Sequence, residues 1–121
     1  MTKMKIAQIK QLKGEVPKRS VLDVLVLEFI DEVYYKVSDD TDGIVLSFEQ
    51  HPQLCKDVAV GRCIRVTSFM RIDDKTIGVT KFSVVGTISP VLGAKSLNDI
   101  EGNLSFCCKR SMSITCAYFS L

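Results

Sequence analysis

The alternation of apolar and polar positions predicts a chain built mainly from β-strands. Short runs rich in β-branched and aromatic residues follow one another, and clusters of Asp, Gly, Ser and Pro separate them. The expected strands cover residues 21–30, 33–38, 44–48, 62–72 and 76–85. Pro52 suits the first turn of a helix, so residues 52–58 are expected to form a short helix between the third and fourth strands.

The clearest element of this pattern is the stretch VYYKVSDDTDGIVLSF, residues 33–48. Two strand-like runs flank the turn formers at residues 39–43, so the stretch is predicted to be a β-hairpin. Because strand side chains alternate, one side is expected to face the core and the other to be available for binding. The core side holds Val33, Tyr35, Val37, Ile44, Leu46 and Phe48. The binding side holds Tyr34, Lys36, Val45, Ser47 and Glu49.

Five strands with a helix between the third and fourth is the element order of the OB-fold, a small Greek-key barrel. A strand count alone would also permit an SH3-like barrel, but the helix position favours the OB-fold. We therefore predict an all-β, five-stranded barrel over residues 21–88. Residues 1–20 are expected to be a basic N-terminal arm or a segment that leads into the barrel. Residues 89–121 are expected to be a C-terminal tail or a docking segment.

Length and composition narrow the class of protein. The 121 residues fit one domain that can bury a core. With 46% hydrophobic and 25% charged residues, the chain is typical of soluble globular proteins rather than of disordered or membrane proteins. Its longest apolar runs are far shorter than a membrane span, and its first residues lack the apolar region of a secretory signal. We expect an intracellular protein without a membrane partner.

The residue types that most often bind metals or carry catalysis form no recognisable site. The five cysteines show no C-x-x-C spacing, which favours free thiols over disulfides or zinc. They are Cys55, Cys63, Cys107, Cys108 and Cys116. His51 is interpreted as a loop residue. Asp39, Asp40 and Asp42 are interpreted as a structural turn, because the spaced ligands of an EF-hand are missing. Without a catalytic motif, we expect no enzyme, no metal and no cofactor.

Basic residues are concentrated at the start of the chain. The net charge of the whole chain is only +2, but residues 1–20 contain six basic residues and one acidic residue, Glu15, which gives 6 − 1 = +5. The basic ones are Lys3, Lys5, Lys10, Lys13, Lys18 and Arg19. Such a segment indicates a nucleic-acid partner, and a solvated end of the domain is the alternative.

Two phrases of the sequence resemble a known group of OB-folds. They are KVSDDTDGIVLS, residues 36–47, and VGRCIRVT, residues 60–67. They are similar to the replication protein A class and its small relatives of the SOSS type, including telomere-capping relatives. In that group an acidic turn follows the second strand and a glycine phrase opens the fourth. The resemblance implies a nuclear protein that binds single-stranded DNA in replication, repair or telomere protection as part of a complex.

Such relatives stack bases on exposed aromatic side chains and pair phosphates with Lys and Arg. On that pattern the expected nucleic-acid-binding residues are Tyr34, Lys36, Arg65, Phe69, Arg71 and Lys81. Phe69 is expected on the outer face of the fourth strand, between Arg65 and Arg71. The third strand ends at Glu49 instead of an aromatic residue. The loops at residues 31–32 and 73–75 are short and acidic, which disfavours a clamp on a phosphate backbone.

Two functions remain open from the sequence. The first is an OB module that binds single-stranded DNA, with RNA as an alternative because an OB face reads either. The second is a protein-interaction subunit whose barrel or tail docks onto another subunit of a genome-maintenance complex, with little or no nucleic-acid binding.

Overall fold

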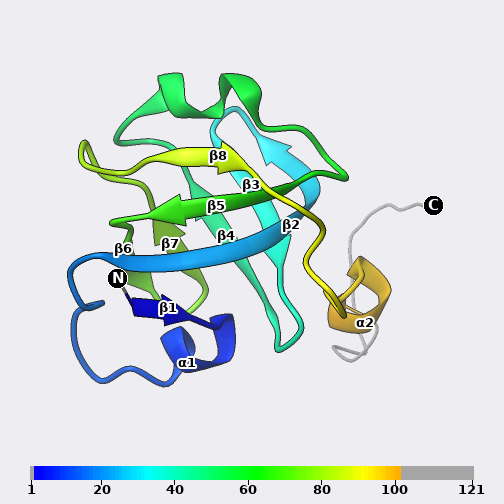
Figure 1. The fold of residues 1–121 in the computed structure, drawn as a ribbon, viewed down its shortest axis with the longest axis horizontal. Coiled ribbons are helices and arrows are strands. Elements are labelled where there is room, and N and C mark those ends of the chain that lie inside the picture. The colour runs from blue at the N-terminus through cyan, green and yellow to red at the C-terminus, as the bar shows by residue number, and fades with distance from the viewer. Residues whose placement is uncertain (1, 102–121) are drawn as a thin grey trace.

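The computed structural model describes residues 2–101, and its fold is mostly β-sheet with a few short helices, as predicted (Figure 1). In chain order the elements are β1 (Thr2–Met4), α1 (Ile6–Lys10), β2 (Ser20–Asp31), β3 (Tyr34–Ser38), β4 (Gly43–Ser47), the 3-10 helix η1 (Pro52–Asp57), β5 (Cys63–Thr67), β6 (Met70–Asp73), β7 (Thr76–Gly78), β8 (Val85–Thr87) and α2 (Leu97–Glu101). The short helix predicted at residues 52–58 is confirmed as η1.

The strands form one curved sheet in the order β6-β7-β4-β3-β2-β5-β8, with β1 paired to β2. β2 pairs antiparallel with β3 and with β5, and β4 pairs parallel with β7. β5 and β6 lie towards opposite ends of this order, yet only Ser68 and Phe69 separate them along the chain. The sheet therefore curls around its buried side, as an OB-like barrel does.

The described sheet is open and has eight strands, so the predicted five-stranded closed barrel is not confirmed. Each of the last two expected strands is divided. Residues 62–72 become β5 and β6, and residues 76–85 become β7, a loop and β8. β1 adds a further strand at the start of the chain.

The division between β5 and β6 changes the direction of Phe69. Ser68 adopts a left-handed backbone with φ of 51°, and its N–H donates to the carbonyl of Ser20 at 3.1 Å. This bend interrupts the side-chain alternation that begins with Arg65, so Phe69 turns inward and is only 4% exposed. The prediction that Phe69 lies on the outer face between Arg65 and Arg71 is wrong.

The core lies on the concave side of the sheet. The predicted core side of the hairpin is confirmed, because Tyr35, Val37, Ile44, Leu46 and Phe48 are buried and Val33 packs against them. Ile6 and Ile9 of α1 are fully buried in the same cluster. Residues 2–10 are therefore packed into the fold, and β1 shares the sheet of the barrel. The division into arm, barrel and tail stays a prediction.

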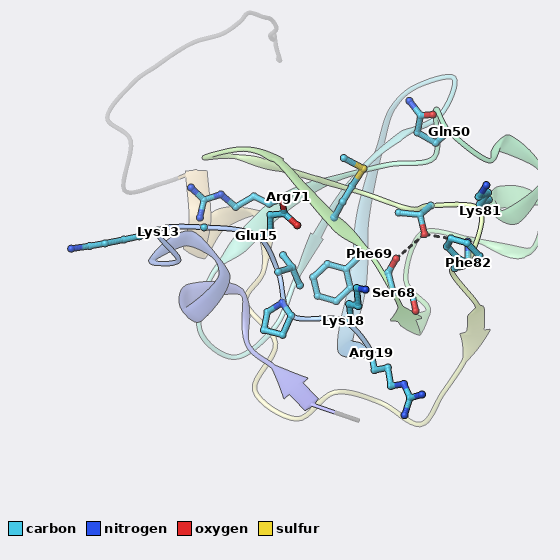
Figure 2. Close-up of a pocket in the computed structure, with 15 residues that line it drawn as sticks. Lys13, Glu15, Lys18, Arg19, Gln50, Ser68, Phe69, Arg71, Lys81 and Phe82 are labelled. Atoms are coloured by element: carbon cyan, nitrogen blue, oxygen red, sulfur yellow. Dashed lines mark hydrogen bonds between the residues drawn. The ribbon is translucent and has the colours of Figure 1, made fainter.

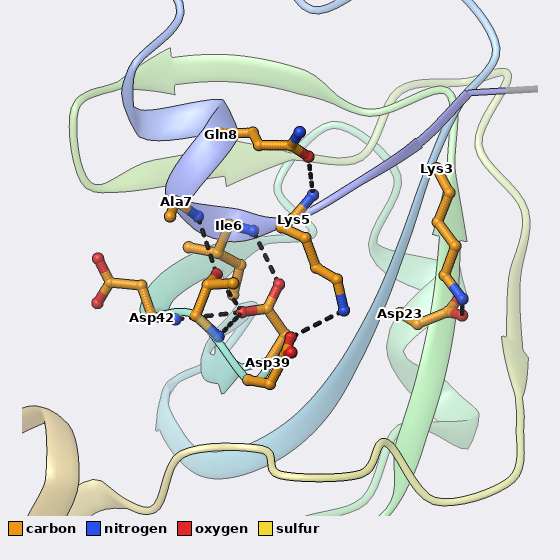
Figure 3. A network of polar contacts seen from close by, with 10 residues as sticks. Lys3, Lys5, Ile6, Ala7, Gln8, Asp23, Asp39 and Asp42 are labelled. Carbon is orange, nitrogen blue, oxygen red and sulfur yellow. Dashed lines mark hydrogen bonds and ion pairs between the residues drawn. The ribbon is translucent and has the colours of Figure 1, made fainter.

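The acidic turn between β3 and β4 holds α1 in place (Figure 3). The buried carboxylate of Asp39 accepts hydrogen bonds from the N–H of Ile6 at 2.8 Å and from the N–H and hydroxyl of Thr41 at 2.8 and 2.6 Å. The Thr41 hydroxyl oxygen accepts from the N–H of Ala7 at 3.1 Å. Free N–H groups at a helix start need such partners, so the turn has the structural role predicted from its sequence.

Residues 88–101 return along the barrel to the same turn. The Ser38 hydroxyl donates to the carbonyl of Lys95 at 2.6 Å, and the N–H of Lys95 donates to the carbonyl of Asp39 at 2.9 Å. Ile100 of α2 lies so close to Gly43 that a Cβ atom there would overlap it. The first part of the predicted tail thus docks on the barrel. Residues 102–121, the rest of that prediction, lie outside the described residues. None of the helices described is long and apolar enough to cross a membrane.

Candidate nucleic-acid interface

An open groove of about 1270 Å³ lies between residues 13–19, the bend from β5 into β6, and the loop from β7 to β8 (Figure 2). Five basic side chains and one acidic side chain line it, a balance of 5 − 1 = +4. The basic ones are Lys13, Lys18, Arg19, Arg71 and Lys81, and the acidic one is Glu15. We call this the basic groove. A cleft lined by one sign of charge attracts ligands of the opposite sign.

The floor of the basic groove is apolar. Phe69 closes it from below, and Val16 and Pro17 line one wall. Val16 also packs against the core, which ties the irregular segment of residues 13–19 to the barrel. Met70 lines the groove as well and is 43% exposed. The groove therefore combines a basic rim with an apolar base.

The loop from β7 to β8 presents an aromatic side chain at the rim. The carbonyl of Ser68 accepts hydrogen bonds from the hydroxyls of Thr80 at 2.9 Å and Ser83 at 3.1 Å. The N–H of Phe82 donates to the Thr80 hydroxyl at 3.2 Å. These bonds hold the loop, and its Phe82 ring is 72% exposed, with the Lys81 ammonium 5.3 Å from the ring centroid. A positive charge over an aromatic face is attractive.

Sequence reasoning missed Phe82 because residues 76–85 were expected to form one continuous strand. The sequence did carry a usable signal. Thr80 and Ser83 flank Lys81 and Phe82, and Thr or Ser side chains often bond to nearby backbone in turns. The sequence places Lys13, Lys18 and Arg19 in the basic N-terminal segment, without a pattern that assigns them to a site.

Arg71 connects the groove to the N-terminal segment. Its guanidinium donates from Nη1 to the carbonyl of Ile9 in α1 at 3.3 Å and to the carbonyl of Leu12, just beyond the end of that helix. Its Nη2 lies 3.9 Å from Asp74, which is too long for a strong ion pair. Arg71 thus positions one wall of the groove and adds charge to it.

Arg65 lies outside the groove, on the outer face of β5. It donates to Asp23 through Nε at 2.7 Å and Nη2 at 2.9 Å, and Lys3 pairs with the same carboxylate at 3.0 Å. The hydrogen bond from Arg65 is the main cause that lowers the pKa of Asp23 below its ordinary value. The Arg65 charge is therefore largely committed to Asp23.

Tyr34 and Lys36 lie on β3, also outside the groove. The Tyr34 hydroxyl donates to Glu49 at 2.8 Å, and this hydrogen bond is the main cause that raises the pKa of Tyr34. Lys36 lies opposite Glu28 on β2 and Val45 on β4. On the outer side of the hairpin, Tyr34 and Lys36 therefore lie next to the carboxylate residues Glu49 and Glu28.

Of the six predicted binding residues, the structure brings Phe69, Arg71 and Lys81 together in the groove and leaves Tyr34, Lys36 and Arg65 elsewhere. That any of them contacts nucleic acid stays a prediction.

The described residues contain no cluster of three or more His, Cys, Asp or Glu side chains that could hold a metal ion. Cys55 and Cys63 are free thiols, as predicted. Cys107, Cys108 and Cys116 lie outside the described residues.

No protein-family model matches the chain, and no curated protein sequence matches it. Solved structures of HIN domains have a similar fold. The Ifi202 HINa domain, in complex with a 20-base-pair DNA duplex, gives a TM-score of 0.54 at 11% identity over 64% of this chain and 44% of that one. The tetrameric p202 HIN2 domain gives 0.58 at 19% identity over 74% and 50% of the two chains. A murine DNA-binding protein bound to double-stranded DNA gives 0.53 at 20% identity over 66% and 45%.

These similarities concern the fold. HIN domains are OB-folds, so the comparison agrees with an OB-like architecture and does not single out the replication protein A class. The chain spans about half the length of these structures.

Proposed function

We propose that this chain is a nucleic-acid-binding domain that holds single-stranded DNA in the basic groove. The observation that carries the proposal is the combination of five basic side chains with the exposed Phe82 ring around one open groove. Proteins that bind single strands combine a positive groove for the backbone with aromatic side chains for the bases. Two of the similar structures are complexes with double-stranded DNA, which supports nucleic acid as the ligand class.

The exposed aromatic ring favours a single strand over a duplex. Stacking of an unpaired base on an aromatic side chain contributes about 1–3 kcal/mol, and the bases of an intact duplex offer no free face. Phe82 is placed at the rim with Lys81 beside it, where one base and its phosphate can be held together.

The resemblance of residues 36–47 and 60–67 to the replication protein A class supports a role in DNA maintenance. We propose that the chain acts there as a nuclear, non-enzymatic subunit of a complex, in replication, repair or telomere protection. DNA is proposed as the ligand, and RNA of the same sequence is the comparison that tests this choice.

The test is a fluorescence-anisotropy titration of the full chain with a labelled single strand and with the matching duplex, at two salt concentrations. If about four phosphates are neutralised, the logarithm of the single-strand affinity falls with the logarithm of salt concentration with a slope of about −3. Lys81→Glu weakens binding, whereas Lys56→Glu, an exposed lysine on η1 outside the groove, leaves it unchanged. Binding that is absent at both salt concentrations contradicts the proposal and favours the protein-interaction subunit.

A further inference from the structure

The surface where β2 turns into β3 differs from the basic groove in its charge. We call residues 28–32 the hairpin end (Figure 1). Phe29 and Ile30 are 50% and 45% exposed there, whereas Leu22, Val24 and Val26 earlier in β2 are fully buried. Contiguous exposed apolar surface with a polar rim is where interaction sites are found, so this pair is a candidate for one.

A β-bulge directs Ile30 outward. Phe29 pairs with Tyr35 and Asp31 pairs with Tyr34, so Ile30 is an extra residue without a partner on β3. Bulges bend a strand and redirect a side chain. The following Glu32 adopts a left-handed backbone with φ of 39°, which is unfavourable for a residue other than glycine. The bulge at Ile30 and the left-handed backbone of Glu32 together leave the Ile30 side chain exposed to solvent.

Phe29 is held in place by an aromatic series that reaches the core. Its ring packs edge-on against Tyr35 at 5.3 Å, and Tyr35 packs edge-on against the fully buried Phe48 at 5.6 Å. A side chain that is already ordered loses little conformational freedom when a partner binds. Exposed aromatic residues of this kind are enriched at protein interfaces.

The charge at the hairpin end is negative. Glu28, Asp31 and Glu32 are exposed, and Lys36 lies opposite Glu28 on β3, so these four residues have a balance of 3 − 1, or two net negative charges. Within the described residues none of these three carboxylates forms an ion pair. A phosphate backbone is repelled by this surface, whereas a polypeptide with Lys or Arg around an apolar side chain complements it.

We propose that the hairpin end is a docking surface for a partner protein that presents a basic segment with an apolar anchor. Ile30 and Phe29 receive the anchor, and Asp31 and Glu32 pair with the flanking cations. The inference rests only on the part of the proposed function that makes the chain a subunit of a complex. It does not depend on DNA binding in the groove.

The test uses a labelled synthetic peptide in which Lys and Arg flank a Leu-Phe pair, titrated into the full chain and followed by anisotropy. The same peptide with Glu in place of Lys and Arg is expected to bind at least about tenfold more weakly. The double variant Asp31→Lys/Glu32→Lys is expected to lose at least about tenfold in affinity for the basic peptide, and Ile30→Ser about fivefold. Leu92→Ser, at an 87% exposed residue elsewhere, is the matched control and leaves affinity unchanged. Phe29 is left intact because its ring also supports Tyr35.

Several results would overturn the docking surface. One is equal affinity of the basic peptide for the unmodified chain and the double variant, which would place the peptide elsewhere. Another is a mass in light scattering that rises with concentration and returns to the monomer in Ile30→Ser, which would make a second copy the occupant. A loss of oligonucleotide binding in Ile30→Ser, which leaves the charge unchanged, would assign the surface to nucleic acid. Failure of the groove is distinguishable, because it removes oligonucleotide binding and leaves peptide binding intact.

Discussion

The basic groove and the hairpin end both expose aromatic or aliphatic side chains, but the charges around them have opposite sign. In the groove, Phe82 stands beside Lys81, with further Lys and Arg side chains along the walls. At the hairpin end, Phe29 and Ile30 stand beside carboxylates. An exposed apolar side chain alone does not identify a ligand. The surrounding charge separates a site for nucleic acid from a site for a basic polypeptide.

The two regions also differ in how they are built. The hairpin end is local, because its residues 28–32 lie where β2 turns into β3, the strand that pairs with it. The groove is assembled from three distant segments, and it depends on hydrogen bonds that tie them together through Arg71 and Ser68. A change that loosens the N-terminal segment should therefore damage the groove more than the hairpin end.

The largest expected effect is on stability, from Asp39→Ala. Removal of this buried carboxylate leaves the N–H groups of Ile6 and Thr41 without their acceptor, so we expect the free energy of unfolding to fall by about 3 kcal/mol. Chemical denaturation measures this change. Asp40→Ala, which removes only the exposed pair with Lys5, is the matched control and should have little effect. Similar losses in the two variants would contradict the structural role of Asp39.

The next effect is on affinity, from reversal of groove charges. We expect Lys18→Glu/Arg19→Glu/Lys81→Glu to weaken single-strand binding by about a hundredfold and to flatten its salt dependence, because phosphate contacts are lost. Anisotropy at two salt concentrations measures both quantities. The matched variant Asp31→Lys/Glu32→Lys should bind the oligonucleotide at least as well as the unmodified chain. A loss in that variant would mean that the two regions do not divide the ligands as we propose.

Phe82→Ala should have a smaller effect. Loss of one stacked base corresponds to about a tenfold loss in single-strand affinity and to little change for a duplex. Phe82→Tyr, which keeps an aromatic ring, should retain binding. An equal loss for the single strand and the duplex would argue that Phe82 supports the loop instead of stacking on a base.

The smallest effect is expected from Arg65→Met, which lies outside both regions. The Arg65 hydrogen bond keeps the pKa of Asp23 in the folded chain below its ordinary value. The ion pair therefore stabilises the fold at pH values above the pKa of Asp23 in the unfolded chain, about 4. This stabilisation is lost as the pH falls through the lower pKa of Asp23 in the folded chain. Arg65→Met should therefore lose less stability between neutral and acid pH than the unmodified chain, as measured by denaturation at both. Its oligonucleotide affinity should change by less than about twofold. A larger loss of oligonucleotide affinity would indicate that Arg65 belongs to the binding site.

The parts of the fold that depend on neighbouring residues could be predicted from the sequence. The hairpin of residues 33–48 is defined by its own turn formers and alternation, and η1 by Pro52. The bend at Ser68 could not be predicted in this way. Its left-handed backbone is stabilised by the carbonyl of Ser20, which lies on β2, 48 positions earlier in the sequence.

The same reason limits the prediction of the site. The sequence shows the basic charge of residues 1–20, but it does not predict that Arg71 joins this segment to β6. Counting alternate residues along β5 placed Phe69 outside, because that count assumes an unbroken strand. The exposed ring was instead Phe82, on a loop that Thr80 and Ser83 attach to Ser68.

The most direct test of the central claim is a chemical-shift map of the isotope-labelled full chain during titration with single-stranded DNA. We predict that the largest shifts fall in residues 13–19, 68–71 and 80–82, and that residues 28–32 do not respond. Shifts centred on the hairpin end or on Tyr34 and Lys36, with none along the groove, would contradict the account.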